Sequence, residues 1–227
     1  RHFGPGRGGG SGLSANKSAG FDAGWDNGKK EEEAGRFEIN GNMRWSHSAT
    51  DRQSRSNSET FLNSAGTSSF SNSRSQDYSH SSNFNSRMWL KWKPDSMTTV
   101  MFAPEYSYSE SNNWSQNRTA TFNNDPYSIA GITDPLGTMF SDTASALKDI
   151  AVNTNHRIST GNSSSNSASY WAMVVRKLNS KGRNISISSN GNWGNSKSKS
   201  FSRSDIKYFQ ENAASRNTFT NQYSNNP

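Results

Sequence analysis

Apolar residues recur at every second position in six short stretches of the chain, which lie near residues 13–26, 36–49, 83–93, 97–109, 167–177 and 184–194. In the first stretch, Phe21 and Trp25 occupy odd positions, whereas Asp22 and Asp26 occupy even ones. Successive side chains of a β-strand point to opposite faces, so a period of two indicates strands with one apolar and one polar face. The fifth stretch is less regular because both of its faces contain apolar residues. The pattern predicts an all-β, antiparallel fold of about six strands.

The segments between these stretches alternate in length. Short connections with turn-forming residues occur at 27–35, 93–96 and 178–183, and long polar segments occur at 50–81, 110–166 and 195–227. Strands joined in this way are typical of outer-membrane β-barrels, whose short turns face the periplasm and whose long loops are extracellular. We therefore predict that the chain is part of an antiparallel transmembrane β-barrel.

Two features of the connecting segments give more local predictions. Apolar residues at helical spacing within the long segment 110–166 predict a short helix near 141–151, capped by Ser141 or Asp142. Pro104 lies in the middle of the fourth stretch, where it cannot donate to a β-ladder. We expect a bulge or an unpaired position beside it.

The composition excludes an ordinary soluble domain. Hydrophobic residues make up 29% of the chain and the mean hydropathy is −0.99, whereas globular proteins contain roughly 45–50% apolar residues. Such a chain cannot fill a core of normal size. Aromatic residues nevertheless make up 11%, which is atypical of disordered chains. No stretch approaches the ~20 apolar residues of a transmembrane helix.

Apolar faces that contact lipid would turn the opposite faces toward the lumen of the barrel. The charged candidates for that lumen are Arg44, Arg87, Lys91 and Glu105. They could bind an anionic ligand or form a hydrogen-bonded wall, and we prefer the wall because every barrel with a polar interior needs one.

Aromatic residues on the apolar faces have two interpretations. They could be stacking platforms for sugars or bases, but interfacial belts at the membrane surfaces explain them better. The belt candidates are Trp25, Trp45, Trp92, Tyr106, Tyr108 and Trp193. A belt accounts less well for Trp89 and Trp171. Trp114, in the long segment 110–166, is the candidate for a ligand contact from a loop.

Catalytic and metal-binding patterns are lacking in the sequence. The chain has no cysteine, and its four histidines are not paired at metal-ligand spacing. We predict no enzymatic activity and no cofactor. The net charge of +7 permits a nucleic-acid partner, but the cations and aromatic residues of 87–93 do not form one stripe, so none is predicted. The alternative functions are a basic, Ser/Asn-rich surface adhesin and a nucleic-acid-binding protein without transport. The adhesin is less favoured because the loop lengths lack the fixed period of a repeat protein.

Several segments together resemble a known family. They are residues 8–21, the Gly28–Lys30 turn with 37–41, residues 92–97 with 102–104, and residues 181–183 with 185–187. In order and spacing they are similar to the barrel of TonB-dependent receptor-like outer membrane proteins. The resemblance covers most of the chain.

The resemblance implies a location in the bacterial cell outer membrane and a gated pore for nutrient uptake. The pore would contain an N-terminal plug domain and be energised through TonB, with outer membrane lipid and a surface lipoprotein as further candidate partners. The chain starts at Arg1 without a methionine. We therefore expect residues 1–227 to be part of a single barrel domain that begins in an extracellular loop, with the plug domain outside this chain.

Overall fold

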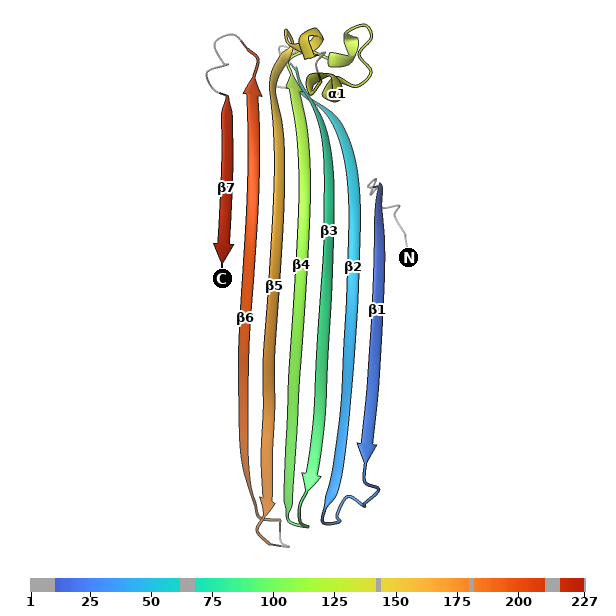
Figure 1. Cartoon of the computed structure of the whole chain (residues 1–227), viewed down its shortest axis with the longest axis vertical. Helices are drawn as coiled ribbons and strands as arrows, with labels where there is room; N and C mark the ends of the chain where they lie inside the picture. Colours follow the sequence, from blue (N-terminus) through green and yellow to red (C-terminus); the bar gives the residue numbers. More distant parts are fainter. Residues whose placement is uncertain (1–10, 62–67, 142–143, 180–181, 211–216, 227) are drawn as a thin grey trace.

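A computed structural model of the protein describes residues 11–61, 68–141, 144–179, 182–210 and 217–226. In this part of the chain, seven antiparallel strands form one sheet and follow their order along the sequence (Figure 1). The strands are β1 (Ser11–Asp26), β2 (Arg36–Phe61), β3 (Ser68–Lys93), β4 (Thr98–Phe122), β5 (Ala151–Lys177), β6 (Asn184–Tyr208) and β7 (Thr218–Asn226). The predicted all-β antiparallel class is confirmed, with one strand more than expected. The described sheet is open, because β1 and β7 lie at its two edges.

The strands extend far beyond the predicted stretches. Each predicted stretch falls on a different strand from β1 to β6, but β2 to β6 contain 25 to 27 residues each. The prediction of long loops at 50–81, 110–166 and 195–227 was therefore wrong for most of their described residues. Their positions 62–67, 142–143, 211–216 and 227 lie outside the described part.

The physical reason for this error is that both faces of the strands become polar beyond the alternating stretches. Serine, asparagine and glutamine give no apolar period there, although the backbone ladder continues without interruption. Polar cross-strand pairs supplement the ladder, as in the hydrogen bond between the hydroxyls of Ser54 and Ser75 at 2.6 Å. Strand formation in these polar regions thus depends on pairing with neighbouring strands rather than on a buried face.

The three connections predicted as short turns, β1–β2, β3–β4 and β5–β6, lie at one end of the sheet, at the bottom of Figure 1. In the β3–β4 turn, the carboxylate of Asp95 accepts hydrogen bonds from the backbone N–H groups of Met97 and Thr98, both at 2.8 Å. These bonds, the one from Met97 foremost, lower the pKa of Asp95. Arg176 on β5 also donates to Asp95 at 2.9 Å. The turn chemistry expected for this aspartate is therefore present, and it ties two hairpins together.

Pro104 interrupts the ladder between β3 and β4. The same register continues on both sides of the interruption, but Met88 and Trp89 have no paired residue opposite them on β4. On its other side, Pro104 is paired with Tyr170 of β5. The expected unpaired position is thus found, without a bulge, because proline has no N–H to donate.

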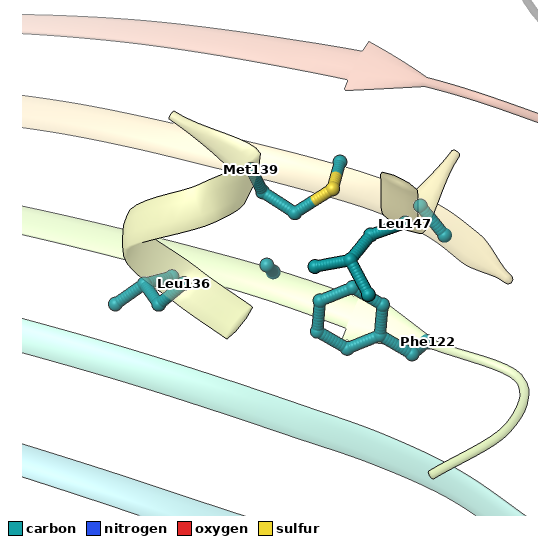
Figure 2. Close-up of a cluster of buried hydrophobic side chains, with 6 residues drawn as sticks. Phe122, Leu136, Met139 and Leu147 are labelled. Carbon is teal, nitrogen blue, oxygen red and sulfur yellow. The ribbon is translucent and has the colours of Figure 1, made fainter. Parts of the chain in front are cut away.

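Residues 123–150 form a small lobe between β4 and β5, at the end of the sheet opposite the short turns (Figure 1). The lobe contains η1 (Pro126–Ser128), α1 (Pro135–Met139) and η2 (Ala144–Leu147). Figure 2 shows Leu147 of η2 next to Phe122 at the end of β4, and Leu136 and Met139 of α1 belong to the same buried cluster. This cluster is the main buried apolar core of the described residues.

The helix predicted near 141–151 was wrong in position. The α-helix lies earlier, at Pro135–Met139, and only a short 3-10 helix falls within the predicted range. Pro135 explains the earlier start, since proline has the backbone angle of a first helical residue and needs no N–H partner there. Ser141 lies between α1 and η2, and Asp142 lies outside the described residues.

The sheet is a single layer with both faces open over most of its length. The chain exposes 15737 Å² of surface, whereas a compact protein of 25.1 kDa would expose about 10,300 Å². The difference arises because only the lobe covers part of one face. A single-layer sheet of this size requires another medium or another structure against its apolar surface.

Candidate functional site

Cross-strand pairing divides the side chains of the sheet between two faces, because residues directly opposite each other share a face. Odd positions of β1, β2, β6 and β7 and even positions of β3, β4 and β5 point to one side, up to the register shift near Phe122. We call this side the band face and the other side the polar face. The alternation read from the sequence corresponds to these two faces.

The band face has a continuous band of apolar side chains in the half of the sheet near the short turns. One cross-strand row at its turn-side edge consists of Phe37, Trp92, Val100, Val174 and Ile187. A second row, eight residues further along β2, contains Trp45, Phe84 and Tyr108. The residues between the rows include Phe21, Ile39, Met43, Met88, Leu90 and Phe102. Many side chains of the band are exposed to solvent, Ile187 to 69% and Phe21 to 63%.

All six belt candidates lie on the band face and close to its two edges. Trp92 belongs to the turn-side row and Trp25 lies one row inside it. Trp45 and Tyr108 belong to the opposite edge row, with Tyr106 and Trp193 one row inside that edge. The structure therefore brings residues from β1, β2, β3, β4 and β6 into two aromatic borders around one apolar band.

The four charged candidates all lie on the polar face. Arg87 forms a salt bridge with Glu105 across β3 and β4 at 3.2 Å, and Arg44 forms one with Asp22 of β1 at 2.8 Å. Each of these four side chains is at least half exposed, and ion pairs this exposed to solvent add little to stability. Within each pair the positive and negative charges neutralise each other, as expected for a hydrogen-bonded wall rather than for an anion-binding site.

Lys91 is engaged differently, at the turn-side end of the polar face. Glu31, in the β1–β2 turn, forms ion pairs with Lys91, with Lys93 at 3.0 Å and with Arg36 at 3.3 Å. Hydrogen bonds from Lys91 and then Lys93 lower the pKa of Glu31 to about 2. Lys91 thus fixes the turn against β3.

A shallow groove of about 570 Å³ crosses the polar face from β1 to β4. Its lining includes Trp89, the amide side chains of Asn40 and Asn42, and the Arg87–Glu105 pair. An aromatic surface beside amides and a neutralised ion pair can bind an uncharged polar molecule through stacking and hydrogen bonds. This groove is the candidate ligand contact on the polar face.

Trp89 also stacks on Trp171 of β5. Their ring centroids are 5.8 Å apart and their planes are inclined by 11°. Ala103 occupies the β4 position between them: it is paired with Trp171 and lies opposite Trp89 in the register of the flanking residues. A small side chain at this position leaves room for the two indoles to meet.

The two tryptophans belong to an apolar patch near the short turns that the sequence interpretation missed. Its other members are Met101, Ala103, Met173 and Val175, which also lie on the polar face. The signal was present in the fifth stretch, where apolar residues occupy both faces. We define these six residues as the inner patch.

Trp114 does not lie in a loop, and that prediction was wrong. It lies within β4 on the band face, because residues 98–122 form one continuous strand. Its cross-strand row, six residues beyond Tyr108, also contains Tyr78, Thr160, Phe201 and Tyr223. A further aromatic row, separate from the two borders, therefore lies outside the apolar band.

The described residues contain no group of three or more His, Asp or Glu side chains able to hold a metal ion. None of the helices in the described part of the chain is long and apolar enough to cross a membrane. The chain matches no known protein-family model, and no curated protein matches its sequence.

Proposed function

We propose that this chain forms part of the wall of a β-barrel in the bacterial outer membrane, with the band face toward lipid and the polar face toward the lumen. The observation that carries the proposal is the band itself: one apolar zone across six strands, bordered by aromatic residues on both edges, opposite a face rich in serine and asparagine. Such an arrangement matches lipid between two aqueous interfaces.

The inclination of the band relative to the strands supports this proposal. Its turn-side edge follows one cross-strand row from Phe37 on β2 to Val174 on β5, and the shift occurs at the flanking strands. From Trp25 on β1 to Ile185 on β6 the edge moves by four residues in total. Four residues are about 14 Å along a strand, and five inter-strand steps span about 24 Å, so the strands are inclined by about 30°. This angle is close to the ~35–45° tilt of membrane barrels.

The height of the band agrees with that tilt. The two edge rows of β2 are eight residues apart, which is about 27 Å along the strand. At an inclination of about 30° the height is about 24 Å, close to the ~25 Å apolar zone of outer-membrane barrels. The polar halves of the strands and the lobe would then project beyond the membrane surface, with the short turns in the periplasm.

Closure of the barrel would require strands other than those described here. The free edges of β1 and β7 would pair with these strands, since unpaired backbone groups at membrane depth are costly. In that arrangement the polar face becomes the wall of a lumen lined largely by neutral side chains. Hydrogen bonds between the hydroxyls of Ser107 and Ser167 and of Ser109 and Ser165, each 2.7 Å long, illustrate this wall.

The resemblance to TonB-dependent receptor-like proteins extends the proposal to nutrient uptake. In that interpretation a plug domain occupies the lumen and TonB supplies energy from the periplasmic side. The inner patch supports this extension, because an apolar surface at the periplasmic end of a polar lumen is suited to packing against a folded domain. The groove beside Trp89 would then face the ligand path.

Extraction and refolding of the 227-residue chain would test the membrane assignment. We expect aggregation in plain buffer and a β-rich species in detergent micelles, because the exposed band needs an apolar medium. A monodisperse, folded protein in buffer without detergent would contradict the proposal. A soluble species that also binds oligonucleotides with strong salt dependence would instead support the nucleic-acid alternative.

A further inference from the structure

A second groove lies on the band face, outside the apolar band. It has a volume of about 360 Å³, and its lining includes Tyr78, His80, Asn112, Trp114, Lys199 and Tyr223. The row of Trp114 is six residues beyond the row of Tyr108, which is about 20 Å along the strand. We call this site the outer groove. In the proposed orientation it would lie above the lipid tails, at the level of large headgroups.

A series of ring contacts joins the apolar band to the outer groove. Trp45 at the band edge stacks on His47, with centroids 6.2 Å apart and planes inclined by 13°. His47 contacts His80 at 6.2 Å, and His80 contacts Tyr78 at 5.9 Å. A molecule with an apolar part and a ring-rich polar part could therefore contact one continuous surface.

Polar side chains beside the aromatic row form a small hydrogen-bonded network. Asn112 lies 3.0 Å from Nε2 of His80 and donates to Glu110 at 3.2 Å, and Asn162 donates to Asn112. The Nδ1 atom of His80 is buried and has no hydrogen-bond partner in the described part of the chain. Amide and imidazole groups fixed in this way can exchange hydrogen bonds with hydroxyl groups.

The cations near the outer groove differ from those of the polar face. Lys197 and Lys199 are two residues apart on β6 and both point to the band face. Within the described residues, neither lysine lies in an ion pair, whereas Arg44, Arg87 and Lys91 do. Two lysines without an ion-pair partner, whose backbone positions are about 7 Å apart along the strand, can bind one phosphate group.

We propose that the outer groove binds the phosphorylated saccharide headgroup of a glycolipid whose acyl chains lie against the apolar band. Trp114 and Tyr223 would stack on sugar rings, Asn112 and Asn162 would bond hydroxyls, and the two lysines would bind phosphate. This inference rests on the proposed function, because it requires the band face to contact lipid. It assigns to Trp114 a ligand on the outside of the barrel rather than in the transport path.

Native mass spectrometry of the full chain in detergent would test the inference. The probe is a rough-type bacterial lipopolysaccharide, which joins phosphorylated sugars to acyl chains. We expect Trp114→Ala and the double variant Lys197→Gln/Lys199→Gln each to weaken binding about tenfold. Lys17→Gln is the matched control: Lys17 shares the cross-strand row of Lys197 but lies on β1, five strands away. The affinity of the Lys17→Gln variant for the lipopolysaccharide should change less than about twofold, as expected for a distant site.

Two further probes decide which part of the glycolipid is recognised. Phosphatidylglycerol, which has a phosphate but no saccharide, should bind at least about tenfold more weakly. The inference is overturned if phosphatidylglycerol binds equally well, if the deacylated saccharide alone binds as tightly, or if Trp114→Ala has no effect. Insertion into bilayers, measured separately, distinguishes the two levels: a chain that inserts without binding refutes only this inference, whereas a chain that does not insert refutes the proposed function as well.

Discussion

Trp89 on β3 and Trp171 on β5 stack over Ala103 of β4, with their ring centroids 5.8 Å apart. The stack lies beside Pro104, where the β3–β4 ladder is interrupted. Two large indoles on a largely polar face expose apolar surface, and stacking reduces the exposed surface of each. The stack forms the edge of the inner patch farthest from the short turns, and Trp89 borders the groove on the polar face, so it connects the two features proposed to have functions there.

Replacing Ala103 by leucine should separate the two indoles. The larger side chain would occupy the space between them, and the protein would lose the roughly 0.5–1.5 kcal/mol that an aromatic pair contributes. The exciton signal of the stacked pair in circular dichroism should disappear. Ala172→Leu, at the adjacent position of β5 on the band face, should leave that signal intact. A signal that survives in Ala103→Leu would show that the indoles do not stack over this residue.

The carboxylate of Glu31, in the β1–β2 turn, should stay ionised in unusually acidic solution. Lys91 and Lys93 lower the pKa of Glu31 from 4.5 to about 2. The ion pairs of Glu31 should therefore contribute fully to stability above about pH 4.5 and lose this contribution as the pH falls toward 2. The carboxyl carbon shift of Glu31, followed by NMR in micelles, should titrate near the lower value. In Lys91→Met/Lys93→Met the midpoint should move toward 4.5; a midpoint near 4.5 in the unmodified chain would refute the clamp.

A charge placed on the band should destabilise the chain in bilayers, whereas the same charge on the polar face should not. Met88 lies midway between the two edge rows of the band, and Asn85 lies on the polar face of the same strand. Met88→Lys should cost about 2–4 kcal/mol, the range for a lysine at the bilayer midplane. Asn85→Lys should change the free energy of unfolding by less than about 0.5 kcal/mol. Equal effects in denaturant titrations would argue against a lipid-facing band.

The sequence predicted those parts of the fold in which the two faces of a strand differ. The hairpin from Trp89 to Pro104 is an example: its alternation, its Pro-Asp turn and the interruption at Pro104 were all expected. The alternation indicates which residues share a face, because a shift of one residue would move Leu90 and Trp92 to the other side. Both edges of the apolar band could thus be located before the pairing of strands was known.

The remaining parts were missed because their physical signal is not local. Ser54 and Ser75 lie in strands whose two faces are both polar, so no periodicity marks them. For the same reason Trp114 was assigned to a loop, although it lies in a row of aromatic residues contributed by separate strands. The inner patch combines residues of three strands, and only their pairing brings Trp89 next to Trp171.

The contact of the band face with lipid is the central claim, and labelling along β6 tests it directly. The chain has no cysteine, so single cysteines can carry a spin label without background. Suitable positions are Ile185, Ile187 and Trp193 on the band face and Ser186, Ser188 and Asn192 on the polar face. Gly191 is avoided because a side chain there would clash with Tyr170.

In bilayers, labels at 185, 187 and 193 should be accessible to oxygen and protected from a water-soluble nickel chelate. Labels at 186, 188 and 192 should show the reverse. Labels at Lys197 and Lys199, which lie beyond the apolar band, should not show the high oxygen access of labels at 185, 187 and 193. This alternation is the expected result for a strand between lipid and a water-filled lumen. Equal access of the nickel chelate to both sets of positions would contradict the account.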